Sequence, residues 1–368
     1  MKLVATCAMG IESILKFELY DLGYKDLTIE NGYISFDGTL KDVIQLNLWC
    51  RTAGRIFIEL PSFKAKSFDD LYDAVKDIDW TKWLEKDSKC TIDAVASKNS
   101  ELFSKSDVQR ITKKAIISSL QTSYSVQRFP ETGAHVPIRV VINNDQVSLR
   151  LDTSGHGLNK RGYRTRFDAP LRETLAAAII KLSRWDPEND VLLDPFCGSG
   201  TILIEAAMIA NNIAPGLNQS FCSEDWPMFD SSNWENAHEE ALAKIKKIDY
   251  RIYGSDNNPD ILKTARYNFK KANVDNIYVE TKEFIDIQSR FEKGKIICNP
   301  PYGIRLDEQG EVHKLYAKMG NYLPKHFTNW DYYILSGAED FEEYFNKKAT
   351  KKRKLFNGKI RCDLYQYF

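Results

Sequence analysis

Residues 191–207 read VLLDPFCGSGTILIEAA, and this stretch decides how the second half of the chain folds. A run of apolar residues ends at Asp194, glycines follow at 198 and 200, and a helical pattern begins near Thr201. Glycines permit a tight strand-to-helix turn and let a ligand lie against bare backbone, while the helix N-terminus offers unpaired N–H groups. The stretch therefore predicts a turn that binds a nucleotide-like molecule.

Strand and helix patterns alternate from residue 170 to the C-terminus. Runs such as YRIYGSD and GKIICNP are strand-like, and helical patterns separate them. This order predicts an α/β fold with a doubly wound parallel sheet, whose ligands bind at the carboxyl ends of the strands. The last two runs are joined through Asn357-Gly358, which predicts an antiparallel hairpin with a type I′ turn. The insertion that carries Trp226 and Trp234 is expected to cover this sheet.

The first half of the chain predicts two smaller α+β modules, because 368 residues exceed what one core usually supports. Residues 1–63 follow the order β-α-β-β-α-β, which is typical of a ferredoxin-like unit. Residues 64–155 carry a strand, a long helix and a hairpin, and form a second module. A basic linker at 156–169 leads into the third domain at 170–368.

The kind of nucleotide can be narrowed by exclusion. A P-loop requires Gly-Lys-Ser/Thr, but Gly200 is followed by Thr-Ile-Leu, and a dinucleotide fingerprint requires a third glycine where Leu203 stands. Asp194 would repel a pyrophosphate and attract a cation. Asp256, at the end of the next strand, suits a ribose diol because a carboxylate can accept from both hydroxyls. S-adenosylmethionine meets both demands.

Residues 295–306, KIICNPPYGIRL, end a strand-like run with two consecutive prolines. Each proline lacks an N–H and fixes φ, so neither continues a central strand. We expect the Asn299 side chain and the Pro300 carbonyl to accept hydrogen bonds from an exocyclic amine and so direct its lone pair at a methyl donor. The prolines hold these acceptors rigidly. Tyr302 is expected to stack on a base that has left its helix.

DPFCGSGT, GSDNNP and NPPYG, in this order, resemble the motifs of class I S-adenosylmethionine-dependent methyltransferases that act on exocyclic amino groups. HGLNKRGYR, APLRETLAAAI and IEAAMIANNIAPGL are similar to the narrower family of ribosomal RNA guanine-N2 methyltransferases with an N-terminal THUMP domain. The resemblance is close over residues 155–306. It implies that residues 64–155 are a THUMP RNA-binding domain and that the chain methylates N2 of a guanine, in 23S ribosomal RNA.

The resemblance also implies roles for individual residues. The implied catalytic residues are Asn299, Pro300, Pro301 and Tyr302. The implied cofactor-binding residues are Asp194, Pro195, Phe196, Gly198, Gly200, Thr201, Asp256, Asn257 and Glu283. Glu283 stands where the family has an aspartate that accepts from the adenine amine, and Asp286 is a second possibility. In the linker, Lys160, Arg161, Tyr163 and Arg164 are expected to bind RNA, because such a mixture can grip phosphates and stack on a base.

Composition and residue spacing limit the partners, metal ions and cellular compartment that can be expected for the protein. Lys plus Arg equals Asp plus Glu at 51 each, so no net charge favours a polyanionic partner. Seven scattered cysteines and five separated histidines show no metal-ligand spacing, which predicts no metal and a reducing compartment. With no run of 18 apolar residues and no cleavage-site pattern, the protein is expected to be cytoplasmic. The basic run 346–362 fits either a solvated hairpin or a phosphate-binding patch.

Three other functions are compatible with the same motifs. Transfer RNA could be the substrate, since similar front modules serve both kinds of RNA. A protein glutamine N5-methyltransferase would also use Asn-Pro-Pro-Tyr, because an amide nitrogen has the same delocalised lone pair, although its companion domain is usually a helical bundle. An RNA-binding protein with a silent methyltransferase fold would not bind the cofactor.

Overall fold

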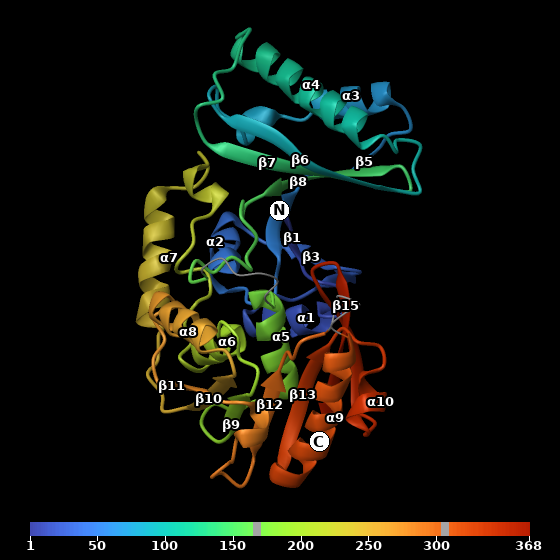
Figure 1. The fold of residues 1–368 in the computed structure, drawn as a ribbon. Helices are drawn as coiled ribbons and strands as arrows, with labels where there is room; N and C mark the ends of the chain where they lie inside the picture. Colours follow the sequence, from blue (N-terminus) through green and yellow to red (C-terminus); the bar gives the residue numbers. More distant parts are fainter. Residues whose placement is uncertain (165–170, 303–308) are drawn as a thin grey trace.

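The computed structural model describes residues 1–164, 171–302 and 309–368. Two β-sheets lie one above the other in Figure 1, and each is covered by helices. The upper sheet belongs to the first half of the chain and the lower sheet to the second half. The two predicted fold types, small α+β modules in front and a doubly wound sheet behind, are therefore confirmed.

The upper sheet has eight strands, paired in the order β2-β3-β1-β4-β8-β7-β6, with β5 beside β8. Its strands are β1 (Lys2–Thr6), β2 (Thr28–Glu30), β3 (Tyr33–Asp37), β4 (Arg55–Glu59), β5 (Phe63–Lys64), β6 (Lys89–Lys98), β7 (His135–Asn143) and β8 (Gln146–Asp152). Its helices are α1 (Glu12–Asp21), α2 (Leu40–Trp49), α3 (Phe68–Lys76), the short η1 (Trp80–Lys82) and α4 (Lys105–Tyr124). Strands β1 to β4 have the ferredoxin-like order that the sequence predicts.

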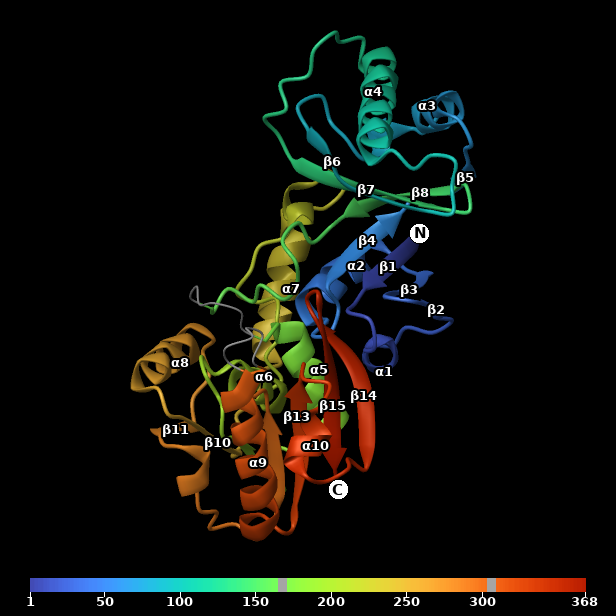
Figure 2. The same ribbon diagram turned by 45° about the vertical axis from the view of Figure 1, so that its right-hand side comes forward.

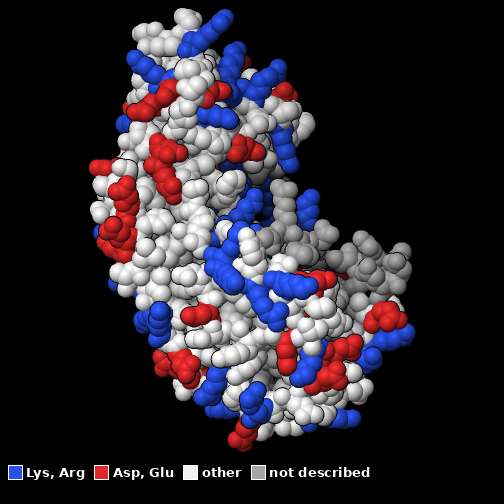
Figure 3. All heavy atoms as spheres, turned by 60° about the vertical axis from the view of Figure 1, so that its left-hand side comes forward, with Lys and Arg blue, Asp and Glu red and all other residues white. Residues whose placement is uncertain are grey.

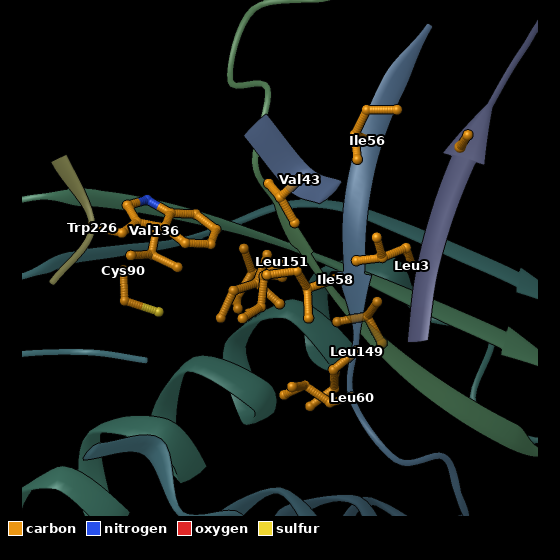
Figure 4. Close-up of a cluster of buried hydrophobic side chains, with 14 of the residues drawn as sticks. Leu3, Val43, Ile56, Ile58, Leu60, Cys90, Val136, Leu149, Leu151 and Trp226 are labelled. Atoms are coloured by element: carbon orange, nitrogen blue, oxygen red, sulfur yellow. The ribbon is translucent and has the colours of Figure 1, made fainter. Parts of the chain in front are cut away.

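One continuous sheet joins the two front modules. Strand β4 pairs antiparallel with β8, with Ile58 opposite Leu151. Buried side chains of both strands lie in the same hydrophobic core, which Figure 4 shows in part. Because backbone hydrogen bonds cross between the modules, they are held together as one body.

The lower sheet has seven strands in the order β11-β10-β9-β12-β13-β15-β14. Its strands are β9 (Val191–Asp194), β10 (Arg251–Asp256), β11 (Ile277–Thr281), β12 (Gly294–Cys298), β13 (Trp330–Ser336), β14 (Lys351–Asn357) and β15 (Ile360–Tyr367). Strands β9 to β13 pair in parallel, whereas β15 is antiparallel to both β13 and β14. The predicted parallel sheet with a C-terminal antiparallel hairpin is confirmed.

Helices cover both faces of the lower sheet. The helices of this half of the chain are α5 (Glu173–Ser183), α6 (Thr201–Ala210), the short η2 (Cys222–Asp225), α7 (Ser231–Ala243), α8 (Pro259–Lys271), the short η3 (Phe284–Asp286), α9 (Gln309–His326) and α10 (Phe341–Phe345), of which η2 and α7 belong to the insertion described below. One core contains buried residues of α5, α6 and α8, and a second contains residues of α9 and α10. Because both faces are covered, its central strands are apolar almost throughout, as the sequence pattern required.

The turn of the C-terminal hairpin differs from the sequence-based prediction. Asn357 pairs with Ile360 in the ladder, so the two turn residues are Gly358 and Lys359 rather than Asn357 and Gly358. Gly358 has φ +69°, and Lys359 is not among the residues with positive φ. This matches a two-residue turn with glycine in first place rather than type I′, which needs positive φ at both positions. The shift leaves the Asn357 side chain at the end of a strand.

The C-terminal hairpin also joins the two halves of the molecule, and Figure 2 shows it beside the N-terminal module. Arg353 donates to the carbonyl oxygen of Gly10 at 2.9 Å and to Ser13 Oγ at 2.7 Å. Ile11 and Ile14 lie in the same core as α5 and α6. Part of the basic run at 346–362 is therefore structural.

Charge is uneven on the surface although the net charge is zero. On the face shown in Figure 3, Lys and Arg side chains gather midway between the upper and lower parts of the molecule, whereas acidic side chains lie mainly around them. A local field of this kind can attract a polyanion without any excess of positive charge over the whole chain.

The insertion between α6 and β10 does not cover the lower sheet, so that expectation was wrong. Trp226 and Trp234 are buried in the core of the upper half, with Phe229 between them. Trp226 lies beside Val136 and Cys90 in Figure 4, and its indole N–H donates to the carbonyl oxygen of His135 at 2.9 Å. The insertion thus fastens the methyltransferase-like half to the front modules. Its tryptophans carried no sequence signal for which core would bury them.

Among the described helices, none is long and apolar enough to cross a membrane.

Candidate active site

The glycine loop lies where β9 ends and α6 begins. Gly198 and Gly200 have φ +50° and +85°, and Gly200 is the N-cap of α6. A Cβ at Gly200 would lie 2.5 Å from the ring of Phe269 on α8. Both positive φ and close packing therefore require glycine there, which explains the pattern that the sequence displays.

Asp194, the last residue of β9, is almost completely buried, with 1% exposure. One of its carboxylate oxygens accepts from the backbone N–H of Phe196 at 3.0 Å. Burial raises the pKa of Asp194 to about 8, with the negative charge of Asp256 adding to the rise against the Phe196 hydrogen bond. A cationic ligand beside this carboxyl would favour its ionised form.

Asp256 ends the neighbouring strand β10, which pairs in parallel with β9. Its two carboxylate oxygens accept from the backbone N–H groups of Gly198 and Asn258, each at 3.0 Å. The side chain is thereby fixed beside the glycine loop. Each carboxylate oxygen retains a second lone pair, so the group can still accept hydrogen bonds from a diol.

The Asn-Pro-Pro-Tyr segment follows β12, the strand on the other side of β9. Pro300 is buried and Asn299 is half-buried. The carbonyl oxygen of Pro301 accepts from the hydroxyl of Tyr316 at 2.7 Å, and the hydroxyl of Tyr302 donates to Asn299 Oδ1. The backbone of the segment is held by rigid rings and by α9.

A single cleft of about 740 Å³ brings these elements together. Of the residues named from the sequence, it is lined by Asp194, Pro195, Phe196, Gly198, Thr201, Asp256, Asn257, Glu283, Asn299, Pro300, Pro301 and Tyr302. Gly200 does not line the cleft, and its part is to allow the tight turn between β9 and α6. A cleft of this size can hold a nucleotide-like cofactor and part of a second ligand.

Glu283 and Asp286 differ in position. Glu283 lines the cleft, whereas Asp286, at the end of η3, does not. Between them, Phe284 lines the cleft and packs against Phe196 with ring centroids 5.3 Å apart. Sequence reasoning missed Phe284, because an aromatic residue after a strand carries no mark that separates a ligand contact from core packing.

Two of the four linker residues that were expected to bind RNA are buried, so their side chains do not form an RNA-binding surface. Arg161 and Tyr163 are buried, with 2% and 1% exposure, and both contact the buried carboxylate of Glu205 on α6. Burial alone would lower the pKa of Arg161, but the Glu205 charge outweighs it and raises that pKa. Arg161 also donates to the carbonyl oxygen of Arg51 at 2.6 Å, so it ties α6 to the front modules.

The other two linker residues have different surroundings. Arg164 is half-buried and donates to the carbonyl oxygen of Leu171 at 2.6 Å and to Thr201 Oγ1 at 3.1 Å. Lys160 is exposed. Of the four residues expected to bind RNA, Lys160 alone has a side chain that is open to a large ligand. Arg166, in the same basic stretch, lies outside the described residues.

No group of three or more His, Cys, Asp or Glu side chains that could hold a metal ion occurs in the part of the chain that the structure describes.

Comparisons with known proteins identify the three parts of the chain. Residues 2–57 match the model of the RlmL ferredoxin-like domain, residues 65–152 that of the THUMP domain, and residues 161–366 that of the RMKL-like methyltransferase domain. YpsC of Bacillus subtilis (strain 168), which is classed by name among RNA methyltransferases, is 42% identical over 100% of this chain and 95% of its own.

Two further similarities concern substrate and cofactor. A ribosomal RNA large subunit methyltransferase K/L from Desulfotalea psychrophila is 32% identical over 98% of this chain, which spans about half (52%) of that relative's length. The crystal structure of SMU.472, complexed with SAH, superposes with a TM-score of 0.93 at 38% identity and covers 100% of this chain and 97% of SMU.472.

Proposed function

The chain belongs to the family of RNA methyltransferases with an RMKL-like methyltransferase domain, and we propose that it methylates the exocyclic N2 of a guanine in large-subunit ribosomal RNA. The methyl donor is S-adenosylmethionine, in keeping with the SAH complex of SMU.472. The observation that carries the proposal is that Asn299 and Pro300 open on the same cleft as the glycine loop.

The residues present fit the donor. Burial raises the pKa of the Asp194 carboxyl to about 8, and a cationic ligand beside it would stabilise its ionised form. Asp256 would accept from the ribose hydroxyls, Phe196 and Phe284 would enclose the adenine, and Glu283 would accept from the adenine amine. Bound there, S-adenosylmethionine supplies an electrophilic methyl group.

The acceptor nitrogen is activated by this chain's own oxygens. A guanine amine is a weak nucleophile because its lone pair is delocalised into the ring. Asn299 Oδ1 and the Pro300 carbonyl oxygen would accept from its two N–H groups and direct the lone pair at the methyl group, and after transfer one proton leaves to solvent. Because the prolines fix the acceptors beforehand, little reorganisation is needed in the transition state. Tyr302 would stack on the base, a contact worth roughly 1–3 kcal/mol.

The front modules would deliver RNA to the cleft. The THUMP domain, the basic region in Figure 3 and the exposed Lys160 support an RNA path between the two halves. The K/L relatives favour large-subunit ribosomal RNA over transfer RNA. With such an RNA as substrate, we propose that the enzyme acts in the cytoplasm.

Mapping of methylated nucleosides tests the proposal. Ribosomal and transfer RNA are prepared from cells with and without the gene and digested, and the nucleosides are quantified by mass spectrometry, followed by mapping of the modified position. We expect one N2-methylguanosine in 23S RNA to disappear and to return when purified enzyme and S-adenosylmethionine are added. Loss of a modified adenosine, loss in transfer RNA alone, or transfer to protein alone would contradict the proposal.

A further inference from the structure

One wall of the active-site cleft is formed by residues that have no proposed role in cofactor binding. Leu171 and Arg172 precede α5, and Asn357 and Ile360 flank the turn of the C-terminal hairpin; all four line the cleft together with Asn299. Neither the glycine loop nor Asp256 belongs to this wall. A methyl acceptor that meets Asn299 would lie against it.

The wall is continuous with the Asn-Pro-Pro-Tyr segment. Tyr302 packs against Gly337, at the end of β13, and its hydroxyl interacts with Cys362 of β15. Cys362 is two residues after Ile360 on the same strand, and Ile360 pairs with Asn357. One side of the cleft therefore runs from Asn299 through Tyr302 to the hairpin turn.

Arg172 is fixed at the far end of this wall. Its backbone N–H donates to Asn357 Oδ1 at 3.3 Å. Three atoms of its guanidinium group would lie 3.4–3.7 Å from a Cβ built on Gly358, so the group lies over a residue with no side chain. These are ordinary van der Waals distances, so the positive φ of +69° is what favours glycine at 358.

The guanidinium of Arg172 differs from two other cations of the cleft in its partners. Within residues 1–164, 171–302 and 309–368, its guanidinium has no ion pair and no hydrogen bond, and it does not cap α5. Two other cations of the cleft are paired, Lys282 with Glu280 at 3.1 Å and Lys314 with Glu311 at 2.8 Å. Lys318 interacts electrostatically with Glu311, and an ammonium is a point charge without a planar fork.

We propose that Arg172 selects guanine by donating two hydrogen bonds to O6 and N7 of the target base. This inference rests on the proposed guanine-N2 activity. When N2 meets Asn299 and Pro300, the edge with two acceptors, O6 and N7, lies across the ring, toward the hairpin end of the wall. A planar fork of donors matches those two acceptors. Adenine has an amino donor in place of O6, so it would meet Arg172 with donor against donor and be rejected.

The test uses a synthetic RNA fragment that carries the nucleotide mapped above, with guanosine, 7-deazaguanosine or inosine at that position. For the native enzyme we expect kcat/KM to fall at least about five-fold on 7-deazaguanosine, which lacks the N7 acceptor. In Arg172→Ala, activity on guanosine falls by a similar or larger factor, and the difference between guanosine and 7-deazaguanosine disappears. Arg172→Lys keeps the charge without the fork and is expected to behave like Arg172→Ala.

The control variant is Arg361→Ala, which removes an arginine of the same hairpin that pairs with Glu339 outside the cleft. It should retain the native preference for guanosine. If Arg172→Ala loses activity but keeps the full 7-deazaguanosine penalty, the guanidinium holds a phosphate and the inference is overturned. Inosine separates the two proposals, because methyl transfer to an RNA that lacks the N2 amine contradicts the proposed function itself.

Discussion

The glycine loop at 194–201 and residues 160–164 of the basic linker carry equally distinctive sequences, but only the loop lies where its sequence predicts, at the edge of a cleft. The loop lines a cleft beside Asp256, as its glycines and acid predict. The linker was interpreted as a basic RNA contact, yet Arg161 and Tyr163 are buried against Glu205. The comparison teaches that local sequence can predict where the backbone needs glycine, whereas it cannot predict which group a charged side chain will contact in the fold.

The physical reason lies in what each residue type requires. A glycine with positive φ reports on the chain immediately around it. An arginine has donors that suit a phosphate and a buried carboxylate equally well, and the choice depends on which residue faces it in the fold. Glu205 lies 44 residues after Arg161, in a helix whose sequence otherwise looks apolar.

The largest effect is expected from removal of Arg161, which tests whether the linker has a structural role. Arg161→Ala leaves Glu205 buried without its cation, and loss of one partner of a buried pair costs about 3–5 kcal/mol in the free energy of unfolding. Urea denaturation of the purified protein measures this loss. Lys160→Ala is the matched control and should change the free energy of unfolding by less than about 0.5 kcal/mol. Equal stability of both variants would mean that the linker is not a structural tie.

Replacement of Tyr302 tests the other end of the cleft. Tyr302→Ala removes the ring expected to stack on the target base and should lower kcat/KM for RNA by the equivalent of about 1–3 kcal/mol. Tyr302→Phe keeps the ring and should retain most of that activity. Radioactive methyl transfer to ribosomal RNA measures both. If the two variants lose activity equally, the hydroxyl rather than the ring is what matters, and stacking on Tyr302 is contradicted.

The pH dependence of cofactor binding tests whether the Asp194 carboxyl interacts with the cationic part of the cofactor. The folded-state pKa of Asp194 is about 8, above its ordinary value of 3.8, so the carboxyl is protonated at neutral pH without a ligand, and the stability this gives is lost as pH rises through 8. A cationic ligand requires the ionised form, so affinity for S-adenosylmethionine should rise about ten-fold per unit between pH 6 and 7.5. Calorimetry measures this rise.

Asp194→Asn supplies the control for that dependence. The variant has no titratable group at position 194. Its affinity for S-adenosylmethionine should therefore be lower than that of the native enzyme and should not change over the same pH range. A native enzyme with a flat profile would show that the carboxyl does not meet the cationic part of the cofactor.

The smallest expected effect concerns Lys160, the exposed residue of the linker. If it contacts one phosphate, Lys160→Ala should weaken RNA binding slightly and reduce the slope of log affinity against log salt by about 0.9 or less. Binding of ribosomal RNA fragments at several salt concentrations measures the slope. An unchanged slope would remove the last linker residue from the RNA interface.

Much of the fold could be predicted from the sequence. Apolar strands covered on both faces, the ferredoxin-like order and the C-terminal hairpin follow from local patterns, and they are confirmed. The burial of Trp226 in the upper core and the shift of the turn to Gly358-Lys359 did not follow, because they depend on packing between segments far apart in the chain. Arg172, Phe284 and Asn357 join the cleft for the same reason.

The most direct test of the central claim separates binding from turnover in Asn299→Ala. Calorimetry gives its affinity for S-adenosylmethionine, and methyl transfer to ribosomal RNA gives its rate. We expect cofactor affinity close to that of the native enzyme and a rate lower by at least about 100-fold, because one of two preorganised acceptors is lost. Native-like transfer by Asn299→Ala would contradict the claim that these oxygens activate the acceptor nitrogen.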